Sequence, residues 1–250
     1  MSGHSHFKSI KHAKGLADKR RGQVFSKLAR EIEITAREGG DPDFNSKLRL
    51  AIERAKELNM PTNNIERAIK RGTGELAGEK LEEVLFEAYG PGNIAIIIEG
   101  ITDNKNRTKN EITQTLNQHN GKLADPGSVK WMFDRKGAIT LLLALEQKKE
   151  ELELKAIEAG AEDLYWHTIT DEAGGAEKKF LDVYTKIEDL EKVKKELEDK
   201  KLEIESASLD WVAKQQLEIE EKDKITCQKL FESLDENEAV QEIYSNIKLP

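Results

Sequence analysis

The 250-residue sequence has one cysteine, few aromatic residues and no long apolar segment. Because Cys227 cannot form a disulfide within the chain, we expect a reducing, intracellular compartment. The longest apolar stretches, "AIIIEGI" and "AITLLLAL", fall short of the roughly 18 residues that a membrane-spanning helix needs. No hydrophobic stretch follows the first basic residues, as a secretion signal would require. The sequence therefore predicts a cytoplasmic protein with no membrane partner.

The sequence also lacks the motifs of common enzymes. Ser128 is not in a G-x-S-x-G motif, there is no G-x-x-x-x-G-K-[ST] phosphate loop, and Cys227 has no histidine near it in sequence. The residues "GTGELA" after Arg71 fit a dinucleotide fingerprint, but a helix precedes them where that motif needs a strand, so we interpret Gly72 as a helix C-cap and hinge. We predict a non-enzymatic protein with no cofactor and no small-molecule substrate.

Positive charge is concentrated at the N-terminal end. Residues 1–37 carry nine bases and three acids, a net charge of 9 − 3 = +6. Residues 1–80 carry 17 − 11 = +6, so residues 81–250 carry −8 − 6 = −14. A cationic segment joined to an anionic body is expected when the segment binds a polyanion. The alternative is a solvated basic helix face.

The segment "SGHSHFKSIKHAK" at residues 2–14 interleaves cations with small residues. Its three histidines could bind a metal, but no fourth ligand appears before Asp18, which disfavours zinc. Small residues let a backbone approach phosphates while cations neutralise them, so we predict a nucleic-acid-binding arm with no metal. The candidate binding residues of this region are His4, Lys8, Lys11, His12, Lys14, Lys19, Arg20, Arg21, Lys27 and Arg30.

A second candidate surface is "TDNKNRTKNE". Lys105, Arg107 and Lys109 lie where a strand gives way to a helix, and backbone N–H groups at a helix start favour a phosphate. A polar loop capped by Asp103 or Asn106 explains the same residues equally well. Further along, Val129, Trp131 and Phe133 alternate as one face of a strand. This pattern favours core packing over base stacking.

Apolar periodicity predicts three short helices before residue 72. The first contains Phe25, Leu28 and Ile32, and the second runs from Phe44 to Leu58. Asn63 is the predicted N-cap of the third helix. After residue 81 strands and helices alternate, with a turn at "GPG" and a helix from Thr108 to His119.

Residues 136–208 read strand, helix, strand, strand, helix, strand, which is the order of a ferredoxin-like unit. We therefore predict an α+β fold: an N-terminal three-helix domain followed by two ferredoxin-like α+β domains, the third inserted into the second. The predicted domains are residues 1–78, residues 79–135 plus 209–250, and residues 136–208.

Several long motifs occur in one order: "GHSHFKSIKHAK", "FSKLAREI", "NMPTNNIERAIKRGTGEL", "YGPGNIAIIIEGITDNKNRT", "GSVKWMFDRKG" and "AGAEDL". With them the chain resembles the YebC family, which includes the mitochondrial translational activator of cytochrome c oxidase. The resemblance implies three domains, no catalytic activity, and a role linked to nucleic acid, either in DNA-binding transcriptional regulation or in assisting translation on the ribosome.

We therefore predict a regulator of gene expression whose partner is nucleic acid, either DNA or ribosomal RNA and possibly the ribosome. Phosphate contacts carry no sequence information, so charge alone does not separate these targets. The helical domain shows no clear recognition helix in its sequence, which favours the ribosome, while the family description favours DNA. A protein-binding adaptor that uses the acidic body is the third alternative.

Overall fold

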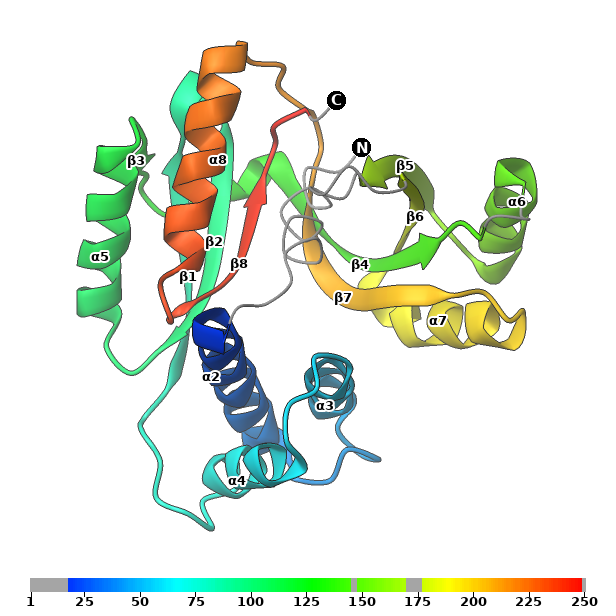
Figure 1. Cartoon of the computed structure of the whole chain (residues 1–250), viewed down its shortest axis with the longest axis horizontal. Helices are drawn as coiled ribbons and strands as arrows, with labels where there is room; N and C mark the ends of the chain where they lie inside the picture. Colours follow the sequence, from blue (N-terminus) through cyan, green and yellow to red (C-terminus); the bar gives the residue numbers. More distant parts are fainter. Residues whose placement is uncertain (1–17, 145–147, 170–176, 249–250) are drawn as a thin grey trace. The chain divides into compact units, whose positions relative to one another are not determined.

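The computed structural model describes residues 18–144, 148–169 and 177–248. Three helices come first and two sheets of four strands follow (Figure 1), so the predicted α+β fold is confirmed. Contacts divide the described chain into two compact units. One unit comprises residues 18–129 and 220–243, and the other comprises residues 130–219 and 244–248.

The first unit begins with a bundle of α2 (Asp18–Thr35), α3 (Ser46–Glu57) and α4 (Thr62–Gly72). Each helix turns its apolar stripe inward. The shared core contains Leu28, Ile32, Ala36, Leu48, Ala51, Ile52, Ala55, Met60, Ile65 and Ala68. Asn45 ends the preceding loop and its side chain accepts a hydrogen bond from the Leu48 amide at 3.0 Å. Phe44 therefore lies outside the helix and is 92% exposed, so the predicted helix start at Phe44 was wrong.

The third helix begins and ends differently from the prediction. α4 begins at Thr62 with Pro61 as N-cap and no side-chain capping bond, so Asn63 is not the cap. Gly72 is the last residue of α4, and the residue with a left-handed backbone is Gly74, at φ +83°. A Cβ atom on Gly72 would lie 2.3 Å from the Glu33 carbonyl oxygen of α2. Gly72 therefore permits close packing of α4 on α2.

The first sheet has the strand order β3-β1-β2-β8. Its elements are β1 (Glu82–Tyr89), β2 (Ala95–Thr102), α5 (Lys105–Gln118), β3 (Lys122–Leu123), α8 (Glu221–Asp235) and β8 (Val240–Ser245). β1 and β2 form an antiparallel hairpin whose turn contains Gly92 at φ +67°, the positive φ that the "GPG" motif predicted. α5 begins at Lys105, three residues before the predicted start at Thr108, and its Ile112 and Leu116 side chains are buried.

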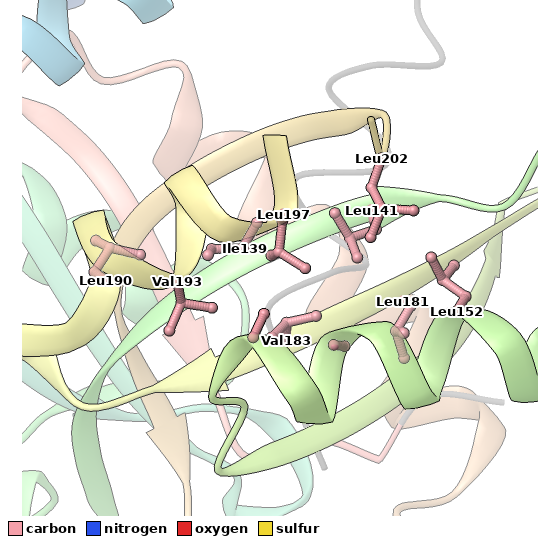
Figure 2. Close-up of a cluster of buried hydrophobic side chains, with 11 residues drawn as sticks. Ile139, Leu141, Leu152, Leu181, Val183, Leu190, Val193, Leu197 and Leu202 are labelled. Atoms are coloured by element: carbon pink, nitrogen blue, oxygen red, sulfur yellow. The ribbon is translucent and has the colours of Figure 1, made fainter. Parts of the chain in front are cut away.

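The second sheet has the strand order β5-β6-β4-β7 with antiparallel neighbours. Its elements are β4 (Phe133–Leu142), α6 (Lys149–Ala159), β5 (Asp163–Ile169), β6 (Lys178–Thr185), α7 (Leu190–Asp199) and β7 (Ile204–Ala213). This is the ferredoxin-like order of strands and helices. Figure 2 shows its core, where Ile139 and Leu141 of β4 and Leu181 and Val183 of β6 meet side chains of α6 and α7.

In the chain, the strands of the second sheet fall between β3 and β8 of the first sheet. The β4–β7 ladder extends from Phe133, which pairs with Ala213, to Leu141, which pairs with Ile204. It therefore runs across both predicted domain boundaries, at 135/136 and 208/209. The division into three domains stays a prediction, whereas residues 133–135 and 209–213 belong to the second sheet.

The segment before β4 is not the predicted strand. Lys130–Met132 form a turn of 3₁₀ helix, and β4 begins at Phe133. Val129 and Phe133 are buried, as the core-packing interpretation expects, but Trp131 is 64% exposed. The 3₁₀ turn breaks the alternation of a strand, so Trp131 no longer shares a face with its two neighbours.

Candidate nucleic-acid interface

The predicted arm lies largely before the described chain. His4, Lys8, Lys11, His12 and Lys14 lie outside the described residues. Lys19, Arg20 and Arg21 fall in the first turns of α2, where the side chain of Arg21 is exposed. The interface predicted for the arm residues therefore stays a prediction.

Lys27 and Arg30, further along α2, have partners within the protein. Lys27 is buried, and its Nζ donates to the carbonyl oxygen of Asp235 at 2.6 Å and to its Oδ1 at 2.8 Å. Arg30 Nη1 donates to the carbonyl oxygen of Glu238 at 2.9 Å. Both cations therefore fix α2 to the C-terminal end of α8 and the turn that follows. We correct the prediction for Lys27, because a buried and paired ammonium group is not available to a phosphate.

A third cation of the bundle, Arg54, also binds an acceptor in the C-terminal part of this unit. Arg54 of α3 donates to the carboxylate of Glu242 on β8, and its guanidinium also lies 3.6 Å from Glu31 Oε2. The bundle is thus joined by Lys27, Arg30 and Arg54 to acceptors between residues 235 and 242. This explains part of the basic composition without a partner molecule.

The second predicted surface lies at the start of α5. Asn104 is the N-cap, and its Oδ1 accepts from the Arg107 amide at 3.1 Å, so neither Asp103 nor Asn106 is the cap. Arg107 pairs with Asp103 and lies 3.8 Å from Glu111 Oε1. A backbone hydrogen bond, together with Arg107, lowers the pKa of Asp103. Within the described chain Lys105 and Lys109 are exposed without an acidic partner.

The turn after α8 brings two of the predicted cations toward one another. Arg30 contacts Glu238 in this turn, while Asn237 Nδ2 donates to Glu111 Oε2 at 2.9 Å. Glu111 in turn faces Arg107. The fold therefore connects the middle of α2 with the start of α5, although 77 positions separate Arg30 from Arg107 in the sequence.

The outer side of α5 carries a shallow open depression that the sequence analysis did not identify. It is lined by Asn110, Thr113, Gln114, Asn117 and Gln118. These are neutral hydrogen-bonding groups with no titratable side chain, so they can bind polar groups but cannot act as a general acid or base. The recurrence of amides at helical spacing was the signal available in the sequence.

The side chains that an enzyme would need have structural surroundings. Cys227 is buried with its Sγ 3.7 Å from the Pro91 carbonyl oxygen, and burial, with the nearby Asp223, raises the pKa of its thiol to about 12. A thiol with so high a pKa is a poor nucleophile at neutral pH. The described residues contain no group of three or more His, Cys, Asp or Glu side chains that could hold a metal ion.

Two histidines have partners within the described residues. His119 is the C-cap of α5, and its Nε2 lies 3.1 Å from the Ser233 hydroxyl of α8. His167 is on β5, where its ring stacks on Phe180 and its Nδ1 lies 3.4 Å from Asp182 Oδ2. His119 has the Ser233 hydroxyl beside its imidazole, but within the described residues no carboxylate is bonded to the ring to complete a catalytic triad.

Among the described helices, none combines the length and the apolar character needed to cross a membrane.

Comparison with known proteins gives matches along nearly the whole chain. A family model described as the TACO1/YebC protein N-terminal domain matches residues 5–75, and one described as the TACO1/YebC second and third domain matches residues 81–247.

Proteins of Chloroflexus aurantiacus (strain J-10-fl) and Persephonella marina, each named "Probable transcriptional regulatory protein", are 44% and 45% identical over 252 residues. Each match covers 100% of this chain and 96% of the relative. The crystal structure of a conserved hypothetical protein from Aquifex aeolicus matches with a TM-score of 0.83 at 43% identity, and covers 96% of both chains.

Proposed function

The chain belongs to the TACO1/YebC family, and from this premise we propose that it is a non-enzymatic, cytoplasmic regulator of gene expression that binds DNA through its basic N-terminal segment. The names of the relatives support a role in transcription. The high pKa and burial of Cys227 support the absence of thiol catalysis.

The observation that carries the proposal is the separation of charge along the chain. Residues 1–37 have a net charge of 9 − 3 = +6, whereas residues 81–250 have −8 − 6 = −14. The cations near the middle of α2 are already bonded to acceptors of the protein. The cations ahead of them, through Arg21, lie in a segment with few apolar residues in its sequence, so their concentration there needs another explanation. A phosphate backbone provides one.

Ribosomal RNA is the alternative target, because phosphate contacts would form with it equally well. In that case the protein would be a translation factor that contacts ribosomal or transfer RNA. The two functions make the same demand on the cations and differ only in the polyanion that is preferred. A direct comparison of targets therefore has to be part of the test.

The test is a salt titration of binding to duplex DNA, single-stranded RNA and purified ribosomes. The full-length protein is compared with a variant in which six cations become glutamine: Lys8, Lys11, Lys14, Lys19, Arg20 and Arg21. If all six contact phosphates, the slope of log K against log salt should decrease by about 4 to 5, at roughly 0.7–0.9 per contact. The target that loses most affinity identifies the partner class.

A matched control variant replaces six lysines with glutamine on the acidic part of the chain. Their side chains are exposed: Lys186, Lys192, Lys195, Lys201, Lys222 and Lys229. Both variants change the net charge by the same amount, so a non-specific effect of charge should appear in both. Equal binding by the wild type and the arm variant at every salt concentration would refute the proposed function.

A further inference from the structure

The second and third helices of the bundle form a helix-turn-helix. α3 ends at Glu57, α4 begins at Thr62, and four residues connect them. Within this turn Asn59 has a left-handed backbone at φ +58°, and Met60 is buried in the bundle core. The Met60 amide donates to the Ala55 carbonyl oxygen at 2.9 Å, which closes the end of α3. Met60 thus anchors the turn in two ways: its amide is hydrogen-bonded to α3, and its side chain packs in the bundle core.

The two sides of α4 have opposite character. Ile65 and Ala68 are buried, and Gly72 packs closely on α2. Positions 63, 67 and 70 follow one another at helical spacing on the opposite side, with position 64 next to them. Asn63, Asn64, Arg67 and Lys70 are exposed polar or cationic side chains of this side, which also carries the acid Glu66.

These four side chains are not used by the fold. Within the described part of the chain, none of them has a hydrogen bond or an ion pair from its side chain. As the N-cap, Asn63 would have used its side chain to accept a backbone hydrogen bond. Because Pro61 is the N-cap instead, the side-chain amide of Asn63 is exposed. This differs from Lys27 and Arg54, whose cationic groups are bonded to Asp235 and Glu242.

The exposed side of α4 is also net positive. The helix has one acid, Glu66, against Arg67, Lys70 and Arg71, a net charge of 3 − 1 = +2. Burial raises the pKa of Glu33, and the positive charge of Arg71 opposes this rise. Arg71 therefore interacts with a residue of the bundle. Arg67 and Lys70 form no ion pair within the described residues, although Glu66 lies one turn before Lys70, and both cations are available to an anion.

We propose that α4 enters the major groove of duplex DNA, with Asn63 and Asn64 facing base edges and Arg67 and Lys70 contacting phosphates. In a helix-turn-helix the N-terminal residues of the second helix contact the bases, and both asparagines lie in the first turn of α4. Asparagine pairs with adenine through two hydrogen bonds in the major groove. The proposal rests on the proposed function in assuming that nucleic acid is the partner, and adds a second contact surface to the arm.

The geometry favours DNA over an RNA duplex. With its 11 residues α4 is about 16 Å long, and the DNA major groove is about 12 Å wide, so one helix can lie within it. The major groove of A-form RNA is too deep and narrow for side chains to read. A helix that presents amides at its start and cations further along therefore matches the DNA groove better.

The test uses two double variants of the full-length protein. The first, Asn63→Ala with Asn64→Ala, removes the proposed base contacts, and the second, Arg67→Ala with Lys70→Ala, removes the proposed phosphate contacts. Exposed amides and lysines outside α4 and α5 supply the controls: Gln215→Ala with Gln228→Ala, and Lys192→Ala with Lys195→Ala on α7. Because all these side chains are exposed, the thermal unfolding of each variant should stay close to that of the wild type.

Binding is measured with random-sequence DNA duplexes of about three helical turns, and with duplexes that the wild type enriches from that pool. The asparagine variant should lose roughly 5- to 150-fold in affinity for each contact on the enriched duplexes, and should bind the random pool normally. The Arg67 and Lys70 variant should bind both sets more weakly, with a salt slope smaller by about 1.8. The controls should match the wild type.

Wild-type binding by both α4 variants would overturn this inference, as would failure of the wild type to enrich any sequence. A loss of affinity confined to RNA or ribosomes would also overturn it, because the surface would then serve a different target. Failure of the proposed function looks different, since the variant without the six arm cations would then bind every target as the wild type does.

Discussion

Lys27 and Lys70 are both lysines of the basic helical region, yet they have opposite surroundings. Lys27 is buried and bonded to Asp235, whereas Lys70 is exposed on α4. The partner of Lys27 lies 208 positions away in the chain. Local sequence therefore could not separate a lysine that stabilises the fold from one that is free to bind, and the predicted site included Lys27 but omitted Lys70.

Replacing Lys27 should weaken the fold. Lys27→Met keeps the apolar stem and removes the ammonium group, so Asp235 loses a charged donor in a partly buried place. We expect the free energy of unfolding to fall by about 2 to 3 kcal/mol, measured by urea denaturation. The control is Lys47→Met, which breaks an exposed pair with Glu38 and should change the same quantity by at most ~1 kcal/mol. Equal effects of both substitutions would contradict the structural role of Lys27.

Among the elements, those with long periodic patterns were predicted well. The inward stripes of α2, α3 and α5 follow from apolar residues at helical spacing, and the ferredoxin-like order follows from alternating strand and helix patterns. The incorrect predictions concern the residues at which elements begin or end. Asn63 carries a capping side chain, but Pro61 is the N-cap, so α4 begins at Thr62, two residues earlier than a cap at Asn63 would place it. Such choices depend on tertiary packing of the turn, which a local pattern does not contain.

Gly72 offers a test of how closely α4 approaches α2. A methyl group at this position would meet the backbone of Glu33, which cannot move without shifting α2. Gly72→Ala should therefore lower the free energy of unfolding by about 1–3 kcal/mol, as overpacked positions do, and this can be measured by urea or thermal denaturation.

The matched control is Gly22→Ala within α2, where a methyl group would meet nothing within 4 Å. Alanine is the better helix former, so this substitution should raise the stability by roughly 0.5–1 kcal/mol. If both substitutions changed the free energy of unfolding in the same direction, the close approach of the two helices would not be the reason for glycine at position 72.

For the molecule as a whole, the chain leaves the first sheet after β3 and returns to it at β8. The sequence indicated this insertion through the closed strand and helix order of residues 136–208. It could not indicate where β4 and β7 end, because the length of each strand is set by its hydrogen-bonded pairing with the other. Five residue pairs, from Phe133 with Ala213 to Gly137 with Leu209, involve positions beyond the predicted limits.

The extent of this ladder leads to a prediction about separable segments. Residues 130–219, expressed alone, should unfold in one cooperative transition, because they contain both edges and both helices of the second sheet. Residues 136–208 keep the same helices but lose Val212, which is buried with Ala138 and Tyr184 on the second face of the sheet. Removing that side chain alone should cost about 1.5–3 kcal/mol, and the lost strand pairs add to it.

Urea denaturation of the two segments, followed by circular dichroism, tests this difference. We expect the longer segment to have a clearly higher midpoint, and the shorter one to be less stable or to lack a cooperative transition. Equal midpoints would mean that residues 133–135 and 209–213 add nothing to the second sheet, and a non-cooperative longer segment would mean that this sheet depends on the rest of the chain for its folding.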